Sequence, residues 1–162
     1  MIWTVHKFGG TSLADENCFR SVAEILLNEQ EGNQAVVVSA IGGVTDLLLG
    51  LVEEAAAQGV FEPSIQVLTE RYHAIVEGLL PKPLGRKLLS EFNDELDSIR
   101  NVLKALYLDK ATSNHSRDMV SGFGELWSAR LLSAFLEGCD HGDGDVLCVD
   151  ARDVLVVEPG EM

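Results

Sequence analysis

Short apolar runs ending in glycine pairs occur twice near the start of the chain. Ile2–Phe8 runs into Gly9-Gly10, and Ala35–Ser39 leads to Gly42-Gly43. The first run is rich in strand-forming residues, and the second is polar on neither face, as in buried parallel strands. Amphipathic segments follow both glycine pairs. The pattern predicts two successive strand–turn–helix units, and therefore an α/β fold with ligands at the carboxyl ends of the strands.

Apolar residues spaced three and four positions apart predict five helices, and we interpret each apolar stripe as core. The first helix has three possible N-caps and ends near Asn28, and the helices after it span 47–58, 64–80, 84–108 and 118–138. The possible caps are Thr11, Ser12 and Asp15.

The C-terminal part of the chain predicts a return to strands. A turn at His141–Asp145 precedes an apolar run at 146–149, and a second run covers 154–157. Strands and helices alternate in a doubly wound sheet, but here the helices outnumber the strands. We therefore expect the sheet to continue beyond Met162 in the native protein.

Charge and composition exclude several classes of protein. The 162 residues carry 12 Lys and Arg against 26 Asp and Glu, a formal net charge of −14, and no basic cluster interrupts them. This balance argues against nucleic acids and anionic membranes as partners. No signal-peptide pattern and no apolar stretch of about 18 residues is present. Three cysteines without CxxC spacing favour free thiols. We expect a soluble, cytoplasmic protein.

The segment Lys7–Ser12 has the composition of a phosphate-binding loop. Glycines let backbone N–H groups approach an anion, a following helix adds partial positive charge, and the lysine can neutralise a phosphate. It is not a Walker loop, because Lys7 precedes Gly9 and Gly10. An ordinary turn followed by a helix N-cap is the alternative interpretation.

A second loop, Ser39–Asp46, repeats this composition between the next strand and helix. Adjacent parallel strands end at the same edge of a sheet, so the two loops are expected to share one crevice. Their pairing favours phosphate binding more than either loop does alone.

Two glycines interrupt the last predicted helix. Gly122 and Gly124 each cost about 1 kcal/mol relative to alanine, which suggests close backbone approach or an irregular helix start. Glu125 lies among apolar neighbours in the sequence and, if it points inward, needs a cationic partner. A substrate ammonium would serve, and so would Arg117 or Arg130.

Other chemistry-bearing patterns are absent from the sequence. The four histidines are scattered without metal-ligand spacing, so we expect no metal held by protein side chains alone. There is no G-x-S-x-G elbow and no arrangement that suggests a catalytic triad.

The motifs, taken in order, resemble those of aspartate kinases in the amino acid kinase family. Lys7–Ser12, Val36–Ala40 and Thr45-Asp46 resemble the start of such kinases. Gly124–Ala129 and Asp150–Val157 are similar to the version found in bifunctional aspartate kinase–homoserine dehydrogenases, a subgroup that the histidine before Lys7 also fits. The resemblance implies an amino acid kinase-like three-layer sandwich with a mostly parallel sheet.

The resemblance implies transfer of the γ-phosphoryl group of ATP, with Mg2+, to the β-carboxylate of L-aspartate, the first step in making the aspartate-family amino acids. Lys7 would be the catalytic residue and would contact the ATP phosphates, with donors from Gly9, Gly10 and Ser39. The Mg2+ would be held largely by ATP oxygens and water.

For the acceptor, the resemblance implies that Thr45 holds the aspartate and that Glu125 binds its ammonium. Many relatives have Asn where this chain has Asp46, and an extra negative charge there should weaken binding unless it points away or caps the helix.

The kinase domains of this family are nearly twice as long as this chain. We expect residues 1–162 to be the N-terminal portion of such a domain, inactive alone, with the remaining kinase, regulatory ACT and dehydrogenase portions absent. The alternative is a non-catalytic, self-associating module that retains half of the kinase fold. A homo-oligomer is expected in either case.

Overall fold

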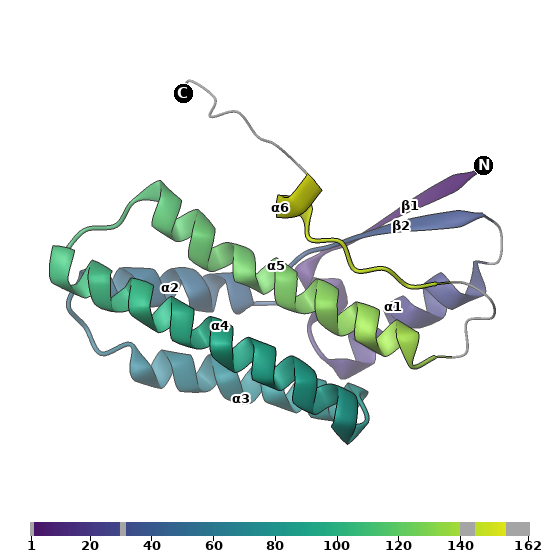
Figure 1. Cartoon of the computed structure of the whole chain (residues 1–162), viewed down its shortest axis with the longest axis horizontal. Coiled ribbons are helices and arrows are strands. Elements are labelled where there is room, and N and C mark those ends of the chain that lie inside the picture. The colour runs from purple at the N-terminus through teal and green to yellow at the C-terminus, as the bar shows by residue number, and fades with distance from the viewer. Residues whose placement is uncertain (1, 30–31, 140–144, 155–162) are drawn as a thin grey trace.

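The computed structural model describes residues 2–29, 32–139 and 145–154. Its long elements follow the predicted order (Figure 1). They are β1 (Trp3–Phe8), the 3-10 helix η1 (Gly10–Leu13), α1 (Glu16–Asn28), β2 (Asn33–Val38), α2 (Val44–Ala56), α3 (Glu62–Leu79), α4 (Lys82–Asp109), α5 (Asn114–Glu137) and the single turn α6 (Ala151–Val154). Within these described ranges, no helix combines the length and the apolar character needed to cross a membrane.

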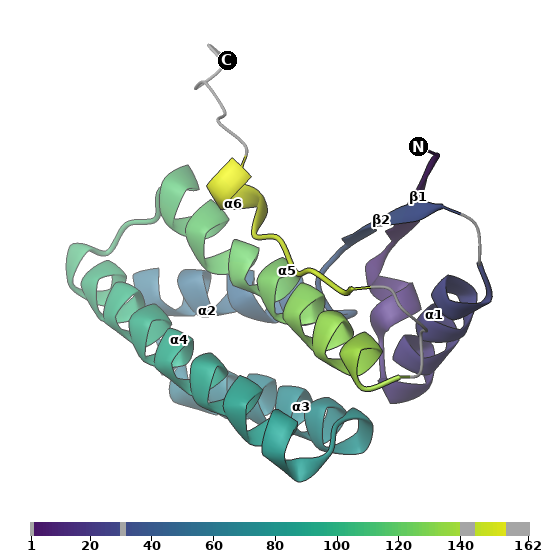
Figure 2. The same ribbon diagram turned by 45° about the vertical axis from the view of Figure 1, so that its right-hand side comes forward.

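The two strands lie side by side in a parallel sheet, and α1 connects them (Figure 2). In their register, Lys7 pairs with Val37 and Phe8 pairs with Val38. Successive residues of a strand point to opposite faces, so Phe8 and Val38 share one face while Lys7 and Val37 share the other. Both strands end at the same edge, and the loops that follow them therefore start there together.

Helix α1 packs against the Phe8 face of the sheet. Gln34 on β2 donates hydrogen bonds to the carbonyls of Leu26 and Glu29 at 3.0 and 3.1 Å. On β1, the His6 Nε2 atom lies 3.0 Å from the Glu29 carboxylate. Phe8 is partly buried and packs against the core, so this face is covered by the helix.

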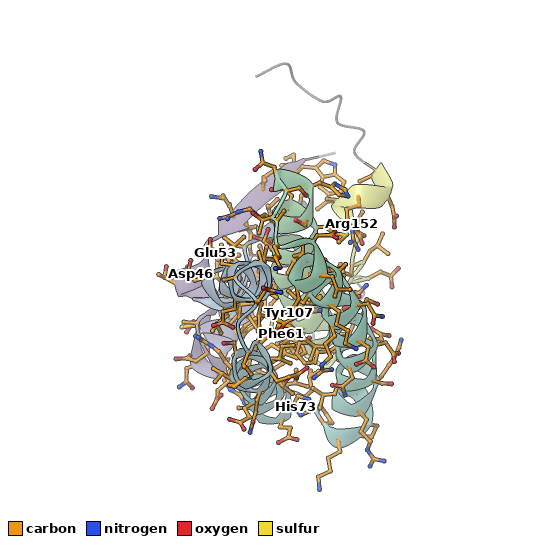
Figure 3. All side chains as sticks on the ribbon, turned by 90° about the vertical axis from the view of Figure 1, so that its left-hand side faces the viewer. Asp46, Glu53, Phe61, His73, Tyr107 and Arg152 are labelled. Atoms are coloured by element: carbon orange, nitrogen blue, oxygen red, sulfur yellow. The ribbon has the colours of Figure 1, made fainter. Side chains whose placement is uncertain are left out.

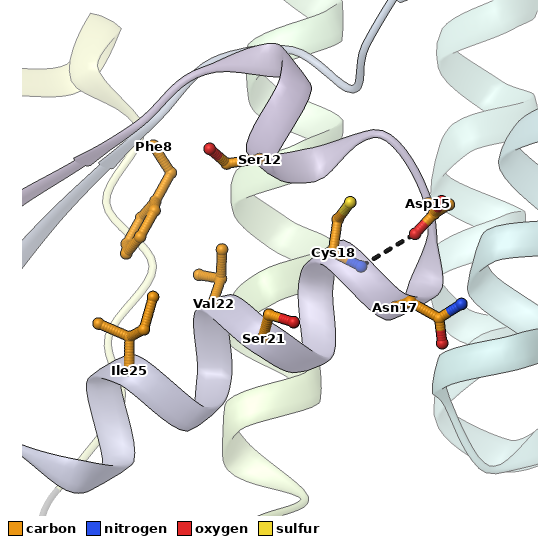
Figure 4. A pocket seen from close by; sticks show the side chains of 8 residues that line it. All are labelled: Phe8, Ser12, Asp15, Asn17, Cys18, Ser21, Val22 and Ile25. Carbon is orange, nitrogen blue, oxygen red and sulfur yellow. Dashed lines mark hydrogen bonds between the residues drawn. The ribbon is translucent and has the colours of Figure 1, made fainter.

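Asp15 is the N-cap of α1, which confirms one of the three predicted caps. Its Oδ1 accepts a hydrogen bond from the Cys18 amide at 2.9 Å (Figure 4). This hydrogen bond lowers the pKa of the Asp15 carboxyl below its usual range. Thr11 and Ser12 lie inside η1 instead, so the chain makes a short 3-10 turn before α1 begins.

Helices α2 to α5 form a layer whose apolar stripes meet in one core (Figures 1 and 2). Tyr72, Phe92 and Trp127 stack at its centre, with the Phe92 ring 4.4 Å from Tyr72 and 4.6 Å from Trp127. The Glu95 carboxylate accepts hydrogen bonds from the Trp127 indole N–H at 2.6 Å and from Arg130 at 2.7 Å. The stripes predicted to be core are buried, and the Glu95 contacts join α4 to α5.

The second face of the sheet is open among the described residues. Trp3, Val5 and Val37 are between 53% and 69% exposed, and Lys7 lies exposed among them. The described residues therefore supply the sheet and the helical layer on one of its faces.

The predicted strand at 146–149 is wrong, because residues 145–150 have no regular secondary structure. Leu147 and Val149 are 81% and 53% exposed, so no neighbouring strand covers them. Asp150 instead accepts a hydrogen bond from the Arg152 amide at 3.0 Å and pairs with its guanidinium, which starts the α6 turn. Residues 141–144 of the predicted turn at 141–145, and residues 155–157 of the run at 154–157, lie outside the described residues.

Candidate active site

The loops that follow β1 and β2 are in contact, as predicted. The Ser39 amide donates to the Phe8 carbonyl at 3.0 Å, which joins the two loops where the strands end. A methyl group on Gly42 would lie 2.9 Å from the Gly10 carbonyl oxygen, and one on Gly10 would lie 3.1 Å from that of Ala40. Because neither position has room for a side chain, the two backbones can pack this closely only with glycine.

Lys7 and Gly9 border open space at this edge. Lys7 is exposed on the open face of the sheet, and no described carboxylate lies within ion-pair distance of it. A methyl group on Gly9 would meet no atom within 4 Å. The first N–H groups of η1, which follow Gly9, have no capping side chain. The first loop therefore offers an anion the Lys7 cation and the backbone at Gly9 and Gly10.

The second loop ends at the N-terminus of α2. Its last residue, Gly43, has a φ of +77° and caps the helix without a side-chain acceptor. The guanidinium of Arg71 on α3 reaches this cap, since a methyl group on Gly43 would lie 3.2 Å from Arg71 Nη1. Thr45 is half-buried in the first helical turn. The helix dipole and Arg71 both make this end of α2 favourable for negative charge.

Asp46 also lies in the first turn of α2 and is exposed at the surface of the helix (Figure 3). It makes no capping hydrogen bond, although a carboxylate near a helix N-terminus is favourable. The Asp46 carboxylate is therefore solvated, which screens its charge.

Helix α5 approaches the second loop through Gly124. A methyl group there would lie 2.9 Å from the Ala40 Cβ and 3.4 Å from the side chains of Leu48 and Val44. A methyl group on Gly122 would meet nothing within 4 Å. Close backbone approach therefore explains Gly124 alone, and the suggested irregular helix start is wrong because α5 is continuous through both glycines.

Glu125 is exposed and does not point inward, so the condition under which it would need an internal cationic partner is not met. Its buried neighbours Leu126 and Trp127 point to another side of α5. The two arginines considered as partners bind elsewhere: Arg117 pairs with Glu53 at 3.1 Å, and Arg130 pairs with Glu95. In the part of the chain that the structure describes, Glu125 has no ion-pair partner, which leaves its carboxylate open to a ligand.

Two residues that contact the second loop, Arg71 and Ser128, were not predicted from the sequence. Arg71 lies in α3, far from both loops in sequence, and nothing in its neighbourhood predicts its position. Ser128 is completely buried, and its hydroxyl lies 2.6 Å from the Ser39 carbonyl. Ser128 follows Gly124 by four residues and so lies on the same face of the helix. This spacing could have predicted that both residues face the second loop.

A shallow pocket of about 360 Å³ lies beside the first loop, on the α1 side of β1 (Figure 4). Its lining comprises Phe8, Ser12, Asp15, Asn17, Cys18, Ser21, Val22 and Ile25. Phe8 and Ser12 belong to the predicted phosphate-binding segment, but the residues given individual roles do not line this pocket. Among the described residues, no three His, Cys, Asp or Glu side chains gather as a metal site would require.

The comparisons with known proteins agree on one family. Its model, that of the amino acid kinase family, matches residues 3–160. Bifunctional aspartokinase/homoserine dehydrogenase 2 of Escherichia coli (strain K12) is 35% identical over 155 residues, which cover 95% of this chain and 18% of that protein. The chloroplastic enzyme of the same name from Arabidopsis thaliana is 31% identical over 159 residues, covering 98% and 17%. The chain thus spans less than a fifth of the length of these curated relatives.

A solved structure gives the same result for the fold. E. coli aspartokinase III in complex with aspartate and ADP matches with a TM-score of 0.71 at 30% identity, over 85% of this chain and 29% of that one. This likeness confirms the predicted α/β, amino acid kinase-like fold class. The two strand–glycine loop–helix units and the family model, which covers nearly every residue, indicate the same family. The chain belongs to the amino acid kinase family.

Proposed function

We propose that this chain is the N-terminal portion of an aspartate kinase domain in a longer protein, where it takes part in phosphorylating the β-carboxylate of L-aspartate with ATP. The observation that carries the proposal is the contact between the loops after β1 and β2, at the edge where Lys7 and Arg71 bring positive charge. The relatives named aspartokinases, one of them solved with aspartate and ADP, support the choice of substrates.

The proposed reaction requires little acid–base catalysis from the protein. A β-carboxylate oxygen of aspartate attacks the γ-phosphorus of ATP, the bond to the β,γ-bridging oxygen breaks, and ADP leaves with its electron pair. Because the carboxylate is already ionised at pH 7, no general base is needed. Catalysis then comes from positioning and from neutralising charge on the transferred phosphoryl group.

Lys7 is the proposed catalytic residue for this neutralisation. Its exposed ammonium has no carboxylate partner among the described residues, so it is available to the phosphates. Gly9, Gly10 and Ser39 lend backbone or hydroxyl donors from the two loops.

The acceptor aspartate is proposed to bind between α2 and α5. Thr45 in the first turn of α2 holds it, and Glu125 accepts hydrogen bonds from its ammonium. The exposed, unpaired state of the Glu125 carboxylate in the described structure supports this role. Arg71 supplies a further cation beside Gly43 for the carboxylates or phosphates that gather there.

The fit of ATP and Mg2+ can be tested against the donors present. The open space at Gly9 and the uncapped start of η1 suit a triphosphate. The Mg2+ would be held mainly by phosphate oxygens and water. When bound, Mg2+ would neutralise charge on the phosphates, while the chain itself orients them.

The open sheet face favours a second candidate, a non-catalytic module that associates through this face. Trp3, Val5 and Val37 form an exposed apolar surface, which marks a contact with the remainder of the protein or with a second copy. In the kinase proposal we expect this chain to be inactive alone because it is only the N-terminal portion of the kinase domain. The exposed surface supports the expected homo-oligomer.

The proposed function is tested by trapping the acyl phosphate with hydroxylamine. Mg-ATP and L-aspartate are supplied to the natural full-length protein and to residues 1–162, each with its Lys7→Ala variant. We expect hydroxamate from the full-length protein, a loss of at least about 100-fold in Lys7→Ala, and no product from residues 1–162.

Lys87→Ala is the matched control, because Lys87 is an exposed lysine on α4 that pairs with Glu91 of the same helix at 4.0 Å. Its activity should equal that of the wild type. No hydroxamate from the full-length protein would overturn the kinase proposal and favour the non-catalytic module. A Lys7→Ala protein with unchanged turnover would overturn the catalytic role of Lys7. Turnover by residues 1–162 would overturn the expectation that the chain is inactive alone.

A further inference from the structure

Ser128 connects α5 to the start of the second loop. Its side chain is 0% exposed, and its Oγ lies 2.6 Å from the Ser39 carbonyl and 2.9 Å from the Glu125 carbonyl. A serine hydroxyl in a helix ordinarily bonds back to a carbonyl of its own helix. One hydroxyl has a single proton, and the shorter distance assigns it to Ser39, outside the helix.

Ser39 is consequently held through both of its backbone groups. Its amide donates to the Phe8 carbonyl of β1 at 3.0 Å, and its carbonyl accepts from Ser128 of α5. Ser39 is the first residue of the loop, and these two hydrogen bonds restrain its backbone. The position from which its side-chain hydroxyl extends is therefore restrained as well.

Gly124 provides a second, independent contact on the same face of α5. It lies one helical turn before Ser128, and the missing side chain lets the helix backbone reach Ala40, which is 2% exposed. The helix therefore contacts two successive loop residues, with a hydrogen bond at Ser39 and with packing at Ala40. Glu125 lies between the two contacts in sequence and moves with them.

We infer that Ser128 is a positioning residue of the site, which holds the loop after β2 against α5 and so fixes Ser39 and Glu125 relative to each other. This inference rests on the proposed function, since Ser39 and Glu125 are site residues only if that function holds. The restraint on the loop, however, can be measured without any ligand.

The first test is hydrogen–deuterium exchange on the ligand-free, full-length protein. Ser128→Ala removes the donor to Ser39, and we expect exchange across residues 39–43 to become about five- to tenfold faster, the effect of one lost hydrogen bond. Exchange in α4 should stay unchanged. A variant that merely loses stability would instead exchange faster throughout the core.

Ser133→Ala is the matched control. Ser133 is 8% exposed on the same helix, but its hydroxyl meets Glu137 of α5 itself at 3.4 Å. It should leave exchange at residues 39–43 as in the wild type. If Ser128→Ala does not fold, Ser128→Cys, which keeps the volume but donates weakly, is measured in the same way.

The second test separates binding from turnover. In Ser128→Ala we expect the KM for ATP to rise about tenfold while kcat falls less, because the loop must be ordered by the nucleotide when it binds. Unchanged exchange at residues 39–43, or a KM equal to that of the wild type, would overturn the inference. If the wild type makes no product but the exchange result appears as expected, the proposed function fails and the loop restraint stands.

Discussion

Arg71 differs from the other partly buried arginines of the chain in what surrounds it. Arg100, Arg117 and Arg130 are half-buried, and each of them pairs with a carboxylate. Arg71 is half-buried and has no carboxylate within 4 Å among the described residues, although the chain carries 26 acidic residues. A cation without a carboxylate partner beside the second glycine loop is available for an anionic ligand.

We predict that Arg71→Gln weakens the binding of the anionic substrates. The loss of one charge-assisted hydrogen bond should raise a KM by about 10-fold to 100-fold, with the protein as stable as the wild type. Steady-state kinetics with ATP and aspartate varied separately would show which of the two substrates Arg71 contacts.

The control for this prediction is Arg86→Gln. Arg86 is an exposed arginine on α4, away from both loops, and its substitution should leave both KM values unchanged. Equal kinetics for Arg71→Gln and the wild type would remove Arg71 from the site.

Residue identity alone could predict part of the site. The glycines and hydroxyls of the two loops are close in sequence to the strands that carry them, so Gly10 and Ser39 were placed correctly at one edge. The orientation of Glu125 was not predictable, because the neighbouring Leu126 and Trp127 do not define which side of the helix faces the core. Arg71 reaches the site through the packing of α3, and that packing leaves no local signal.

At the scale of elements, α5 contains two glycines that look alike in sequence and differ in surroundings. Gly122 borders open space, while Gly124 faces Ala40, Leu48 and Val44. An alanine is favoured over glycine in a helix by about 1 kcal/mol, but only where its methyl group fits.

We therefore predict opposite effects for the two alanine variants. Gly122→Ala should raise the free energy of unfolding by about 0.5–1 kcal/mol. Gly124→Ala should lower it by about 1–3 kcal/mol, because the methyl group would be forced to within 2.9 Å of the Ala40 Cβ. Urea unfolding of both variants beside the wild type measures the two changes. Stabilisation by Gly124→Ala would contradict the close approach of α5 to the loop.

The hydrophobic pattern did not predict the start of α5 or the structure of residues 146–149 correctly. The helix begins at Asn114, four residues before its predicted start, because Ser113 and Ser116 form a capping box that periodicity does not detect. The run at 146–149 has the composition of a strand, yet a strand needs a neighbour to pair with. Composition cannot say whether that neighbour is present.

At the scale of the whole molecule, Tyr72 joins three helices in one core. Its ring stacks on Phe92 of α4, and its hydroxyl lies 3.5 Å from the Trp127 carbonyl of α5. Burial, reinforced by the nearby Glu95 carboxylate, raises the pKa of the Tyr72 phenol well above its usual value of 10.

This raised pKa predicts a loss of stability at high pH. Above pH 10 the unfolded chain releases the Tyr72 proton while the folded chain retains it, so the free energy of unfolding falls by about 1.4 kcal/mol per pH unit from this group. Tyr72→Phe should remove that contribution, which urea titrations between pH 8 and 11 would measure.

Tyr107→Phe is the control for the pH series, because the Tyr107 ring is 38% exposed on α4. Its stability should follow that of the wild type across the whole range. A Tyr72→Phe protein whose stability falls as steeply above pH 10 as that of the wild type would show that other groups cause the fall.

The contact between Gly10 and Gly42 has a consequence for the affinities of the two loops for their ligands. Two backbones this close cannot shift independently, so a ligand that draws one loop toward itself does work on the other. In the proposed function, nucleotide at the first loop would then change the affinity of the second loop for the acceptor. By thermodynamic reciprocity, the acceptor must change the affinity for nucleotide by the same factor, so the two dissociation constants are linked by a single coupling free energy.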